Sequence, residues 1–558
     1  MNKLFIVFLL CLIDFYSQAQ NIIIAKGEVR GPFIWKSKIY PGTERNYWVY
    51  VPKQYDASKA SCLMVVQDGL SRATGWNLTP VLDSLIASKQ IPVMIGVFID
   101  HGTVSSGSQD NYPRYNRSYE YDALGDRYSK FLLEEILPEI SKNYNISSNP
   151  DDRSLAGASS GAICAFNVAW ERPDSFRRVF SSIGTYVGLR GGDDFATLVR
   201  KTEPKPLRVF LEDGNHDLNI YAGDWWMANQ NMLSALTWAG YEVNHAWGEG
   251  GHDGKHATSI LASALTWLWK DYPAPLVAHK TATPRLDLTV DGEGWSEIPL
   301  NDIKATKLAV NKKGELFMVD RLIVYKLDNT GNLSTFAKLK EGITGLSFHN
   351  DGKLYASNPG QHKIVSIDEK GMVSSVVSNV NADFISTSNK GIYFSNFVKD
   401  QIGFYSFLKK EVSYVSVQGK PTGLSLSAEQ TFLNVGIANR AFGFSFKIME
   451  DGTLQFGQDY AHYQQAYGTD NPNVLGMTLD AQNVLYTCTN LGIQVADQLG
   501  RINFIFTKPG ENATDVKLGG SDFNILYAAC NGKLYKRKIN AKGVLSWLPP
   551  VKPPKPGL

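Results

Sequence analysis

The stretch Ser154-Leu-Ala-Gly-Ala-Ser-Ser-Gly161 decides the fold of the first half of this chain. Its last five residues fit the pattern Gly-x-Ser-x-Gly, in which a serine stands at the tip of a sharp turn between a strand and a helix. Gly157 and Gly161 let the strand and the helix pass each other closely because glycine carries no side chain. The pattern predicts that Ser159 projects its hydroxyl from the edge of a sheet, as a nucleophile would.

Alternating strands and helices surround this turn. Near-continuous apolar runs are typical of buried parallel strands, and apolar residues at helical spacing indicate helices packed on them. The expected strands are Tyr47–Val51, Cys62–Gln67, Pro92–Asp100, Val209–Leu211 and Tyr241–Trp247, and the expected helices include Tyr121–Tyr144 and His256–Trp269. This alternation predicts a doubly wound α/β sheet over residues 20–272.

A nucleophilic serine needs a base, and the base needs an acid to orient it. We favour His252 as the base, because it follows an expected strand and precedes the last helix, at the carboxyl edge of the sheet. The competing histidines are His216, His245 and His256. The pattern therefore predicts a base on a loop that can reach Ser159.

The segment Leu211–Asp217 supplies three acids for the orienting role. Asp217 lies past the turn at Gly214, from which a side chain can reach back over the sheet edge, so we favour it. Asp213 is the main alternative, and Glu212 is nearer the strand end, where it can serve as a turn or cap residue. The chain order serine, acid, histidine is the order of α/β hydrolases.

An oxyanion produced at the serine would need two N–H donors. The backbone of Ser160 is one candidate. The second is Gly69, in the loop after the strand Cys62–Gln67, although Asp68-Gly69 can equally be a plain turn.

Three larger side chains are candidates for substrate binding. Trp225 and Trp226 can stack a sugar or an aromatic group, and core packing is nearly as consistent with the sequence. For Arg117 we favour an ion network with Glu120 and Asp122 over a substrate clamp.

Together these motifs resemble the esterase family that includes esterase D, enterochelin esterase, and feruloyl and acetylxylan esterases. The matching stretches are Tyr47–Pro52, Gln67–Gly69, Asn116–Asp122, Phe131–Pro138, Gly157–Gly161, Gly214–Asp217 and Gly251-His252. The resemblance implies an α/β-hydrolase fold and ester hydrolysis through a serine acyl-enzyme, with no metal or other cofactor. It implies feruloyl-sugars, acetyl-sugars or siderophore lactones as substrates. We expect a carbohydrate-linked ester, with a siderophore trilactone as the alternative.

The second half of the chain has a different pattern. A Pro-rich linker, 273–285, is followed over 286–548 by short aromatic-centred strands after turns, and a Pro-rich tail occupies 549–558. About six such units recur, at 305–330, 342–368, 379–408, 420–448, 473–500 and 512–538. Repeats of this spacing predict a six-bladed β-propeller, with seven blades as the alternative.

The propeller resembles the six-bladed gluconolactonase family, whose members hold a divalent cation with Glu, Asn and Asp side chains. At the corresponding places this chain has Thr422, Leu475 and Ala382, with Asn381 next to the last. Leucine cannot ligate a cation, so we expect that the metal site is lost and that the domain is auxiliary. An active lactonase and a glycan-binding protein are the alternatives.

The termini and composition bear on location and partners. The formal net charge is +2, which gives no electrostatic case for nucleic acid or an anionic membrane. Residues 1–19 read as a signal peptide, with Lys3, an apolar run and a small-x-small cleavage site, and predict export to the periplasm or outside the cell. A lipoprotein acylated at Cys11 is the rival interpretation. No later stretch is apolar enough to span a bilayer, and a Cys488–Cys530 bridge stays open.

Overall fold

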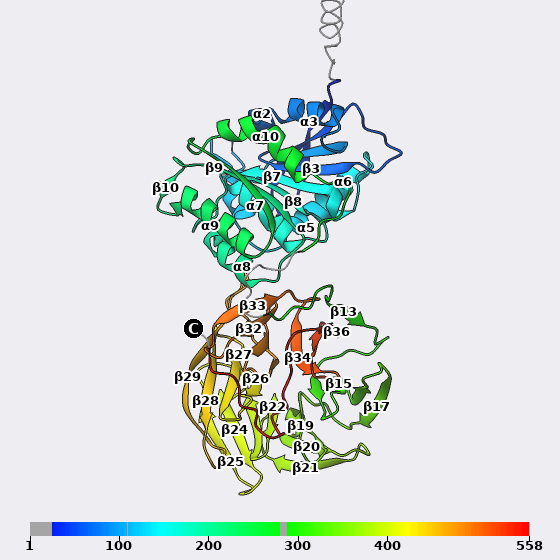
Figure 1. Cartoon of the computed structure of the whole chain (residues 1–558), viewed down its shortest axis with the longest axis vertical. Helices are drawn as coiled ribbons and strands as arrows, with labels where there is room; N and C mark the ends of the chain where they lie inside the picture. Colours follow the sequence, from blue (N-terminus) through cyan, green and yellow to red (C-terminus); the bar gives the residue numbers. More distant parts are fainter. Residues whose placement is uncertain (1–24, 109, 279–286, 557–558) are drawn as a thin grey trace, which may run out of the picture. The chain divides into compact units, whose positions relative to one another are not determined.

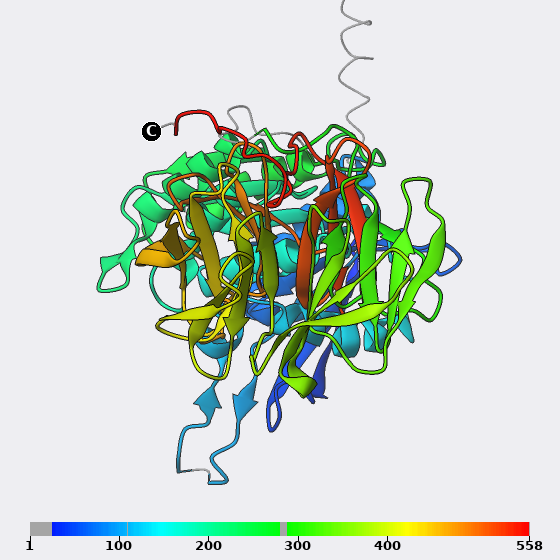
Figure 2. The same ribbon diagram turned by 90° about the horizontal axis from the view of Figure 1, so that it is seen from below.

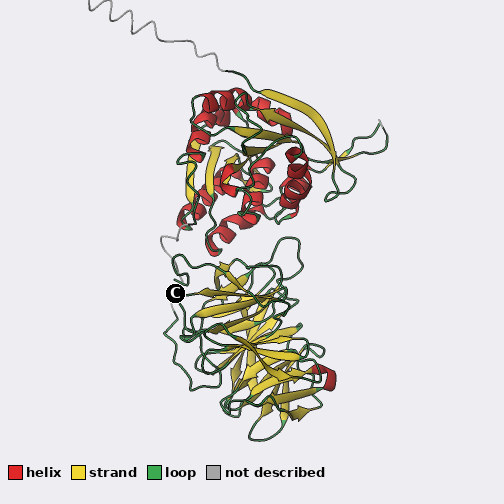
Figure 3. Ribbon diagram, turned by 90° about the vertical axis from the view of Figure 1, so that its right-hand side faces the viewer, coloured by secondary structure: helices red, strands yellow, loops and turns green. Residues whose placement is uncertain are grey.

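The structure is a computed structural model that describes residues 25–108, 110–278 and 287–556. The described residues form two compact units. The first contains the described residues of 25–197 and 204–278, and the second contains residues 198–203 and 287–556. Figure 3 shows that the long helices belong to the first unit, whereas the second consists of strands and loops with one short helical turn, Pro359–Gln361. The expected signal peptide, 1–19, lies outside the described residues. Among the described helices, none is long and apolar enough to cross a membrane.

One ten-stranded mixed sheet organises the first domain, in the order β12-β9-β8-β7-β3-β4-β2-β5-β6, with β1 paired to β2. The strands are β1 (Glu28–Lys36), β2 (Glu44–Val51), β3 (Cys62–Gln67), β4 (Met94–Ile99), β5 (Thr103–Val104), β6 (Arg114–Tyr115), β7 (Arg153–Ala158), β8 (Arg178–Ser182), β9 (Arg208–Gly214) and β12 (Glu242–Gly248). The six strands from β12 to β4 are parallel, and β2 joins them antiparallel. Both central strands, β3 and β7, are buried at every residue.

Helices cover both faces of this sheet. They are α2 (Gly69–Gly75), α3 (Leu78–Ala87), α4 (Arg117–Tyr121), α5 (Arg127–Lys130), α6 (Leu137–Ser141), α7 (Ser160–Glu171), α8 (Phe195–Lys201), α9 (Trp225–Trp238) and α10 (Lys255–Leu268). Figure 1 shows α2, α3 and α10 on one side of the sheet and α5, α7 and α9 on the other. The predicted α/β-hydrolase arrangement of the first domain is confirmed.

The helix expected over Tyr121–Tyr144 is interrupted in the structure. It consists of α5, a π-helical turn at Phe131–Ile136 and α6, in place of one continuous helix. Pro138 explains part of the break, because proline has no N–H to donate to the preceding turn. The side chains predicted to share one buried face are nevertheless all buried: Tyr128, Phe131, Leu132, Ile136 and Ile140.

The second domain is a six-bladed propeller, as predicted. Its blades are four-stranded sheets. The strands of each blade are given from the inside outwards. Blade one is β14 (Leu308–Val310), β15 (Leu316–Asp320), β16 (Ile323–Leu327) and β17 (Leu333–Lys338); blade two is β18 (Gly345–Phe348), β19 (Leu354–Asn358), β20 (Lys363–Ile367) and β21 (Val373–Ser378); blade three is β22 (Ile385–Ser388), β23 (Gly391–Asn396), β24 (Gln401–Ser406) and β25 (Val412–Ser416). Blade four is β26 (Pro421–Leu426), β27 (Phe432–Ile437), β28 (Phe442–Ile448) and β29 (Leu454–His462); blade five is β30 (Met477–Leu479), β31 (Leu485–Cys488), β32 (Ile493–Ala496) and β33 (Ile502–Phe506); blade six is β34 (Ala513–Gly519), β35 (Ile525–Cys530), β36 (Lys533–Lys538) and β13 (Ser296–Ile298). Each innermost strand contacts the next, and β34 contacts β14, so the ring is closed.

The last blade takes its outermost strand from the start of the domain, because β13 pairs antiparallel with β36. This pairing joins the two ends of the propeller. The repeat units predicted from the sequence ended too early: the first stopped at residue 330, before β17, and the fourth at 448, before β29. The outer strands β17 and β29 are largely exposed, so they lack the buried apolar pattern of the strands inside. Cys488 and Cys530 are buried free thiols, so no bridge joins them.

Candidate active site

The turn at Ser159 has the strained geometry that its sequence predicts. Ser159 lies between β7 and α7 with φ 57° and ψ −123°, outside the regions that ordinary residues prefer. A Cβ atom at Gly157 would lie 2.1 Å from the carbonyl oxygen of Gly161, so strand and helix can cross only where residue 157 has no side chain. The Ser159 N–H donates to the Ser182 carbonyl on β8 at 2.9 Å, which fixes the turn to the neighbouring strand.

Ser159, His252 and Asp217 form a continuous chain of hydrogen bonds. The His252 Nε2 atom lies 2.9 Å from Ser159 Oγ, and its Nδ1 atom lies 2.6 Å from Asp217 Oδ1. The Asp217 side chain is fully buried, and its Oδ1 also accepts the N–H of Leu218 at 2.5 Å. A carboxylate placed at Nδ1 directs the free lone pair of the imidazole, at Nε2, toward the serine hydroxyl.

Asp213, the alternative acid, lies beside Asp217 instead of contacting the histidine. Both carboxyl groups have a buried Oδ2 atom without another partner among the described residues. Burial, followed by the hydrogen bond and charge of Asp217, raises the pKa of Asp213. Burial would also raise the pKa of Asp217, but hydrogen bonds from His252, Asp213 and Leu218 outweigh it and lower that pKa. The two opposite pKa shifts favour a proton on Asp213 and a charge on Asp217.

The other histidines have different partners. His256 Nδ1 lies 2.8 Å from Glu212 Oε1, and the same carboxyl accepts the Ser182 hydroxyl at 2.6 Å. Burial raises the pKa of Glu212. His216 Nδ1 lies 3.0 Å from a backbone carbonyl, and the His245 ring packs on Trp247 with centroids 4.8 Å apart. Of the four candidates, His252 is the one brought to Ser159.

The two candidate oxyanion donors occupy equivalent positions. Ser160 is the first residue of α7, and Gly69 is the first residue of α2. Amides in the first turn of a helix have no intrahelical acceptor, so they can donate to a ligand. Gly69 has φ +58°, and a Cβ atom there would lie 2.0 Å from Asp100 Oδ1, so the turn requires glycine.

Arg117 holds the loop that carries Gly69. Its guanidinium donates to both carboxylate oxygens of Asp68, at 2.7 and 2.8 Å, and Nη2 lies 3.4 Å from the carbonyl of Ala158, the residue before the serine. The ion network expected around Arg117 therefore has Asp68 as its partner. Glu120 pairs with the buried Arg45 instead, at 2.5 Å.

The two tryptophans differ in their surroundings. Trp225 is 3% exposed, and its ring meets the His252 ring edge to face at 5.8 Å. Its Nε1 donates to Thr185 Oγ1 at 3.3 Å, and that oxygen lies 3.3 Å from Ser159 Oγ. Trp226 is half-buried, and its ring packs edge to face on the Trp247 ring. Sequence reasoning missed Thr185, although its place just after β8, next to β7, is the kind of strand-end position that could have revealed it.

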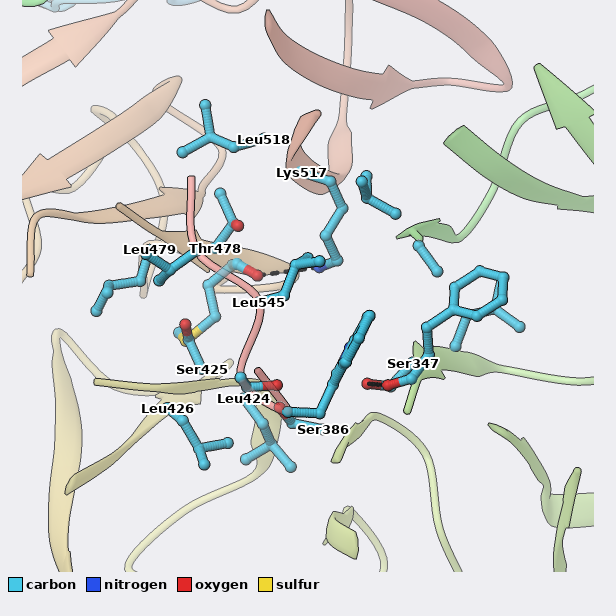
Figure 4. Close-up of a pocket in the computed structure, with 18 of the residues that line it drawn as sticks. Ser347, Ser386, Leu424, Ser425, Leu426, Thr478, Leu479, Lys517, Leu518 and Leu545 are labelled. Carbon is cyan, nitrogen blue, oxygen red and sulfur yellow. Dashed lines mark hydrogen bonds between the residues drawn. The ribbon is translucent and has the colours of Figure 1, made fainter. Parts of the chain in front are cut away.

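All six innermost strands of the propeller line its channel, and five of them contribute a polar side chain. Ser347, Ser386, Ser425, Thr478 and Lys517 lie around a cavity of about 80 Å³ (Figure 4), and residues 544–547 also line it. The Lys517 ammonium donates to the Met477 carbonyl at 3.0 Å, drawn as a dashed line in Figure 4, and to Asp515 Oδ1 at 3.1 Å.

The polar side chains near the centre of the propeller are not a suitable ligand set for a divalent cation. Asp515 is already occupied by Lys517 and by the N–H of Leu308. Lys307 lies over the Phe384 ring at 3.8 Å, and burial lowers its pKa. Thr422, at one family ligand position, donates its hydroxyl to the Val474 carbonyl at 2.8 Å. Within the described ranges, no group of three or more His, Cys, Asp or Glu side chains could hold a metal.

A family model and several curated relatives match part of this chain. Residues 39–271 match the family model described as "Putative esterase". The iron(III) enterobactin esterases of Dickeya dadantii and Escherichia coli K12 are each 26% identical, over 249 and 243 residues; the matches cover 42% of this chain and 53% and 56% of those proteins. The chain thus spans about half the length of these relatives.

Solved structures resemble parts of the chain. The enterobactin esterase of Shigella flexneri is 22% identical with a TM-score of 0.36, and the match covers 46% of this chain and 62% of that one. A protein titled a putative gluconolactonase is 14% identical with a TM-score of 0.41, covering 46% and 96%.

Proposed function

Because residues 39–271 match the esterase family model, we propose that the first domain hydrolyses carboxylic esters through a covalent intermediate on Ser159. The hydrogen-bond chain Asp217–His252–Ser159 carries this proposal. It supplies a nucleophile, a base within reach of it, and a buried carboxylate that fixes the base.

We assign each step of the reaction to a residue of this site. Ser159 Oγ attacks the ester carbonyl while His252 Nε2 takes its proton. The oxyanion that forms accepts hydrogen bonds from the N–H groups of Gly69 and Ser160. His252 then gives the proton to the departing alcohol, and a water molecule, activated by the same histidine, releases the acid from Ser159. Asp217 stabilises the imidazolium in both halves of the reaction.

For the substrate we propose a carbohydrate-linked ester, feruloyl or acetyl. This rests on the family resemblance of the motifs. A second candidate, a siderophore trilactone, is favoured by the relatives named iron(III) enterobactin esterase.

We propose that the propeller is a non-catalytic auxiliary domain. The side chains of Lys307 and Lys517, which both line a small cavity between the innermost strands, support this, because positive charges there repel the divalent cation that a lactonase of this fold would use. We also propose export, on the sequence pattern of residues 1–19.

A substrate panel tests these proposals. The purified full chain is given p-nitrophenyl acetate, methyl ferulate and a siderophore trilactone, in parallel with Ser159→Ala. We expect hydrolysis by the unmodified chain and loss of nearly all of it in the variant. Full activity in Ser159→Ala would refute the nucleophile, and activity abolished by EDTA would point to the propeller instead.

A further inference from the structure

An arginine-rich cleft of about 650 Å³ lies in the first domain, apart from the catalytic hydrogen-bond chain. Three guanidinium groups line it, those of Arg114, Arg127 and Arg190, and so do the rings of Tyr115 and Tyr119. Arg114 and Tyr115 form β6, part of the light-blue hairpin that projects from the domain in Figure 2. The tyrosines are 61% and 43% exposed, so the cleft is open to solvent.

None of the three arginines pairs with a carboxylate among the described residues. Arg114 donates to the amide oxygen of Asn116 at 3.3 Å, and Arg190 donates to the Ser118 hydroxyl at 3.3 Å. Arg127 donates to the Tyr119 hydroxyl. All of these acceptors are neutral, and no acidic residue lines the cleft. Three positive charges with neutral partners create a local potential that attracts an anion.

Stacking on an aromatic ring orients two of these charges. The guanidinium carbon of Arg127 lies 5.6 Å from the centroid of Tyr119, and that of Arg190 lies 5.8 Å from the same centroid. Arginine stacked in this way is held in place while its N–H fork stays available for a carboxylate. The cleft therefore offers donors that need little reordering when an anion binds.

One short helix connects the cleft to the nucleophile. Ser118 and Tyr119 of α4 line the cleft, and the preceding residue, Arg117, lies 3.4 Å from the carbonyl of Ala158, next to Ser159. Residues 117–119 therefore join the loop beside the nucleophile to the lining of the cleft.

We propose that this cleft binds the carboxylate of an acidic sugar, a uronate, within the substrate chain. The inference rests on the proposed ester hydrolysis, since it assigns a substrate class to that site. The arginine fork matches a carboxylate, and the largely exposed ring of Tyr115 suits the apolar face of a sugar ring. Because the cleft is open to solvent, the remaining sugars of a longer chain can continue outside it.

Binding to the full chain carrying Ser159→Ala tests the proposal, with isothermal titration as the measurement. The probes are a galacturonic acid hexamer and neutral xylohexaose. We expect the acidic oligosaccharide to bind at least about tenfold tighter, with affinity that falls as salt rises. Adding Arg127→Gln or Arg190→Gln should weaken that binding about tenfold each. Arg172→Gln is the matched control, because this arginine is already paired with Asp174 at 2.8 Å.

Several results would overturn the assignment. Equal affinity for the two oligosaccharides would overturn it. Unchanged binding of the acidic oligosaccharide to an Arg127→Gln/Arg190→Gln double variant would also overturn it, provided that the thermal midpoint of unfolding matches that of the parent. Tighter binding of 2,3-dihydroxybenzoylglycine than of the uronate would assign the cleft to an aromatic acid. Hydrolysis of p-nitrophenyl acetate by the chain with Ser159 intact is measured separately. Its absence would refute the esterase proposal, and the binding result would still decide the chemistry of the cleft.

Discussion

Asp217→Asn removes the charge that the proposed mechanism places next to His252. The two side chains are 2.6 Å apart at their nearest atoms, and the carboxylate is fully buried. With about 4 Å between the centres of charge and an effective dielectric constant of about 20, the attraction to the imidazolium is worth about 4 kcal/mol. If it is lost in the transition state, kcat should fall by about 10³-fold.

Asp213→Asn is the matched variant. Asp213 keeps its proton and faces Asp217, so an amide N–H can replace the carboxylic O–H. We expect a loss of less than about tenfold, because a hydrogen bond is retained. Both variants are assayed for kcat and KM with p-nitrophenyl acetate, and circular dichroism checks that each is folded.

Comparing the two variants shows which aspartate orients His252. A larger loss in Asp213→Asn than in Asp217→Asn would make Asp213 the acid. An Asp217→Asn enzyme within about tenfold of the unmodified chain would mean that the buried charge contributes little to the transition state.

Two further predictions concern stability. Gly157→Ala places a Cβ atom 2.1 Å from the Gly161 carbonyl oxygen, so it should lower the free energy of unfolding of the first domain by at least about 2 kcal/mol, measured in urea. Gly75→Ala is the control, because a Cβ atom there meets nothing within 4 Å. An equal loss of stability in the two variants would contradict the packing argument. Burial raises the pKa of Asp480 to about 6, above its value in the unfolded chain, which is about 4. Between these two pKa values the folded propeller binds more protons than the unfolded chain does. The free energy of unfolding should therefore fall by roughly 1–3 kcal/mol as pH rises from about 4 through about 6. Asp480→Asn should flatten that part of the urea-unfolding profile, and an unchanged slope would exclude this carboxyl as its cause.

Much of the site could be predicted because its parts follow strands. Ser159, Asp217 and His252 each come after a parallel strand, and the carboxyl ends of β7, β9 and β12 lie at one edge of the sheet. Periodicity and residue type were sufficient for the buried strands, and the structure places β3 at Cys62–Gln67, as predicted.

The remainder depends on contacts that no local pattern encodes. The proximity of Asp213 and Asp217 arises from the turn between them, and the hydrogen bonds that Asp217 accepts, rather than residue type, distinguish the two carboxyl groups. Closure of the propeller by β13 joins segments more than two hundred residues apart. Lys517 lies in the channel because its strand is innermost, which only the assembled ring determines.

The nucleophilic role of Ser159 is tested most directly by labelling the activated serine covalently. The full chain is treated with diethyl p-nitrophenyl phosphate, which phosphorylates an activated serine, and the modified peptide is identified by mass spectrometry. We expect one diethyl phosphate on the peptide containing Ser159 and none in the Ser159→Ala variant. Modification at another residue, or an unmodified Ser159 in a chain that still hydrolyses esters, would contradict it.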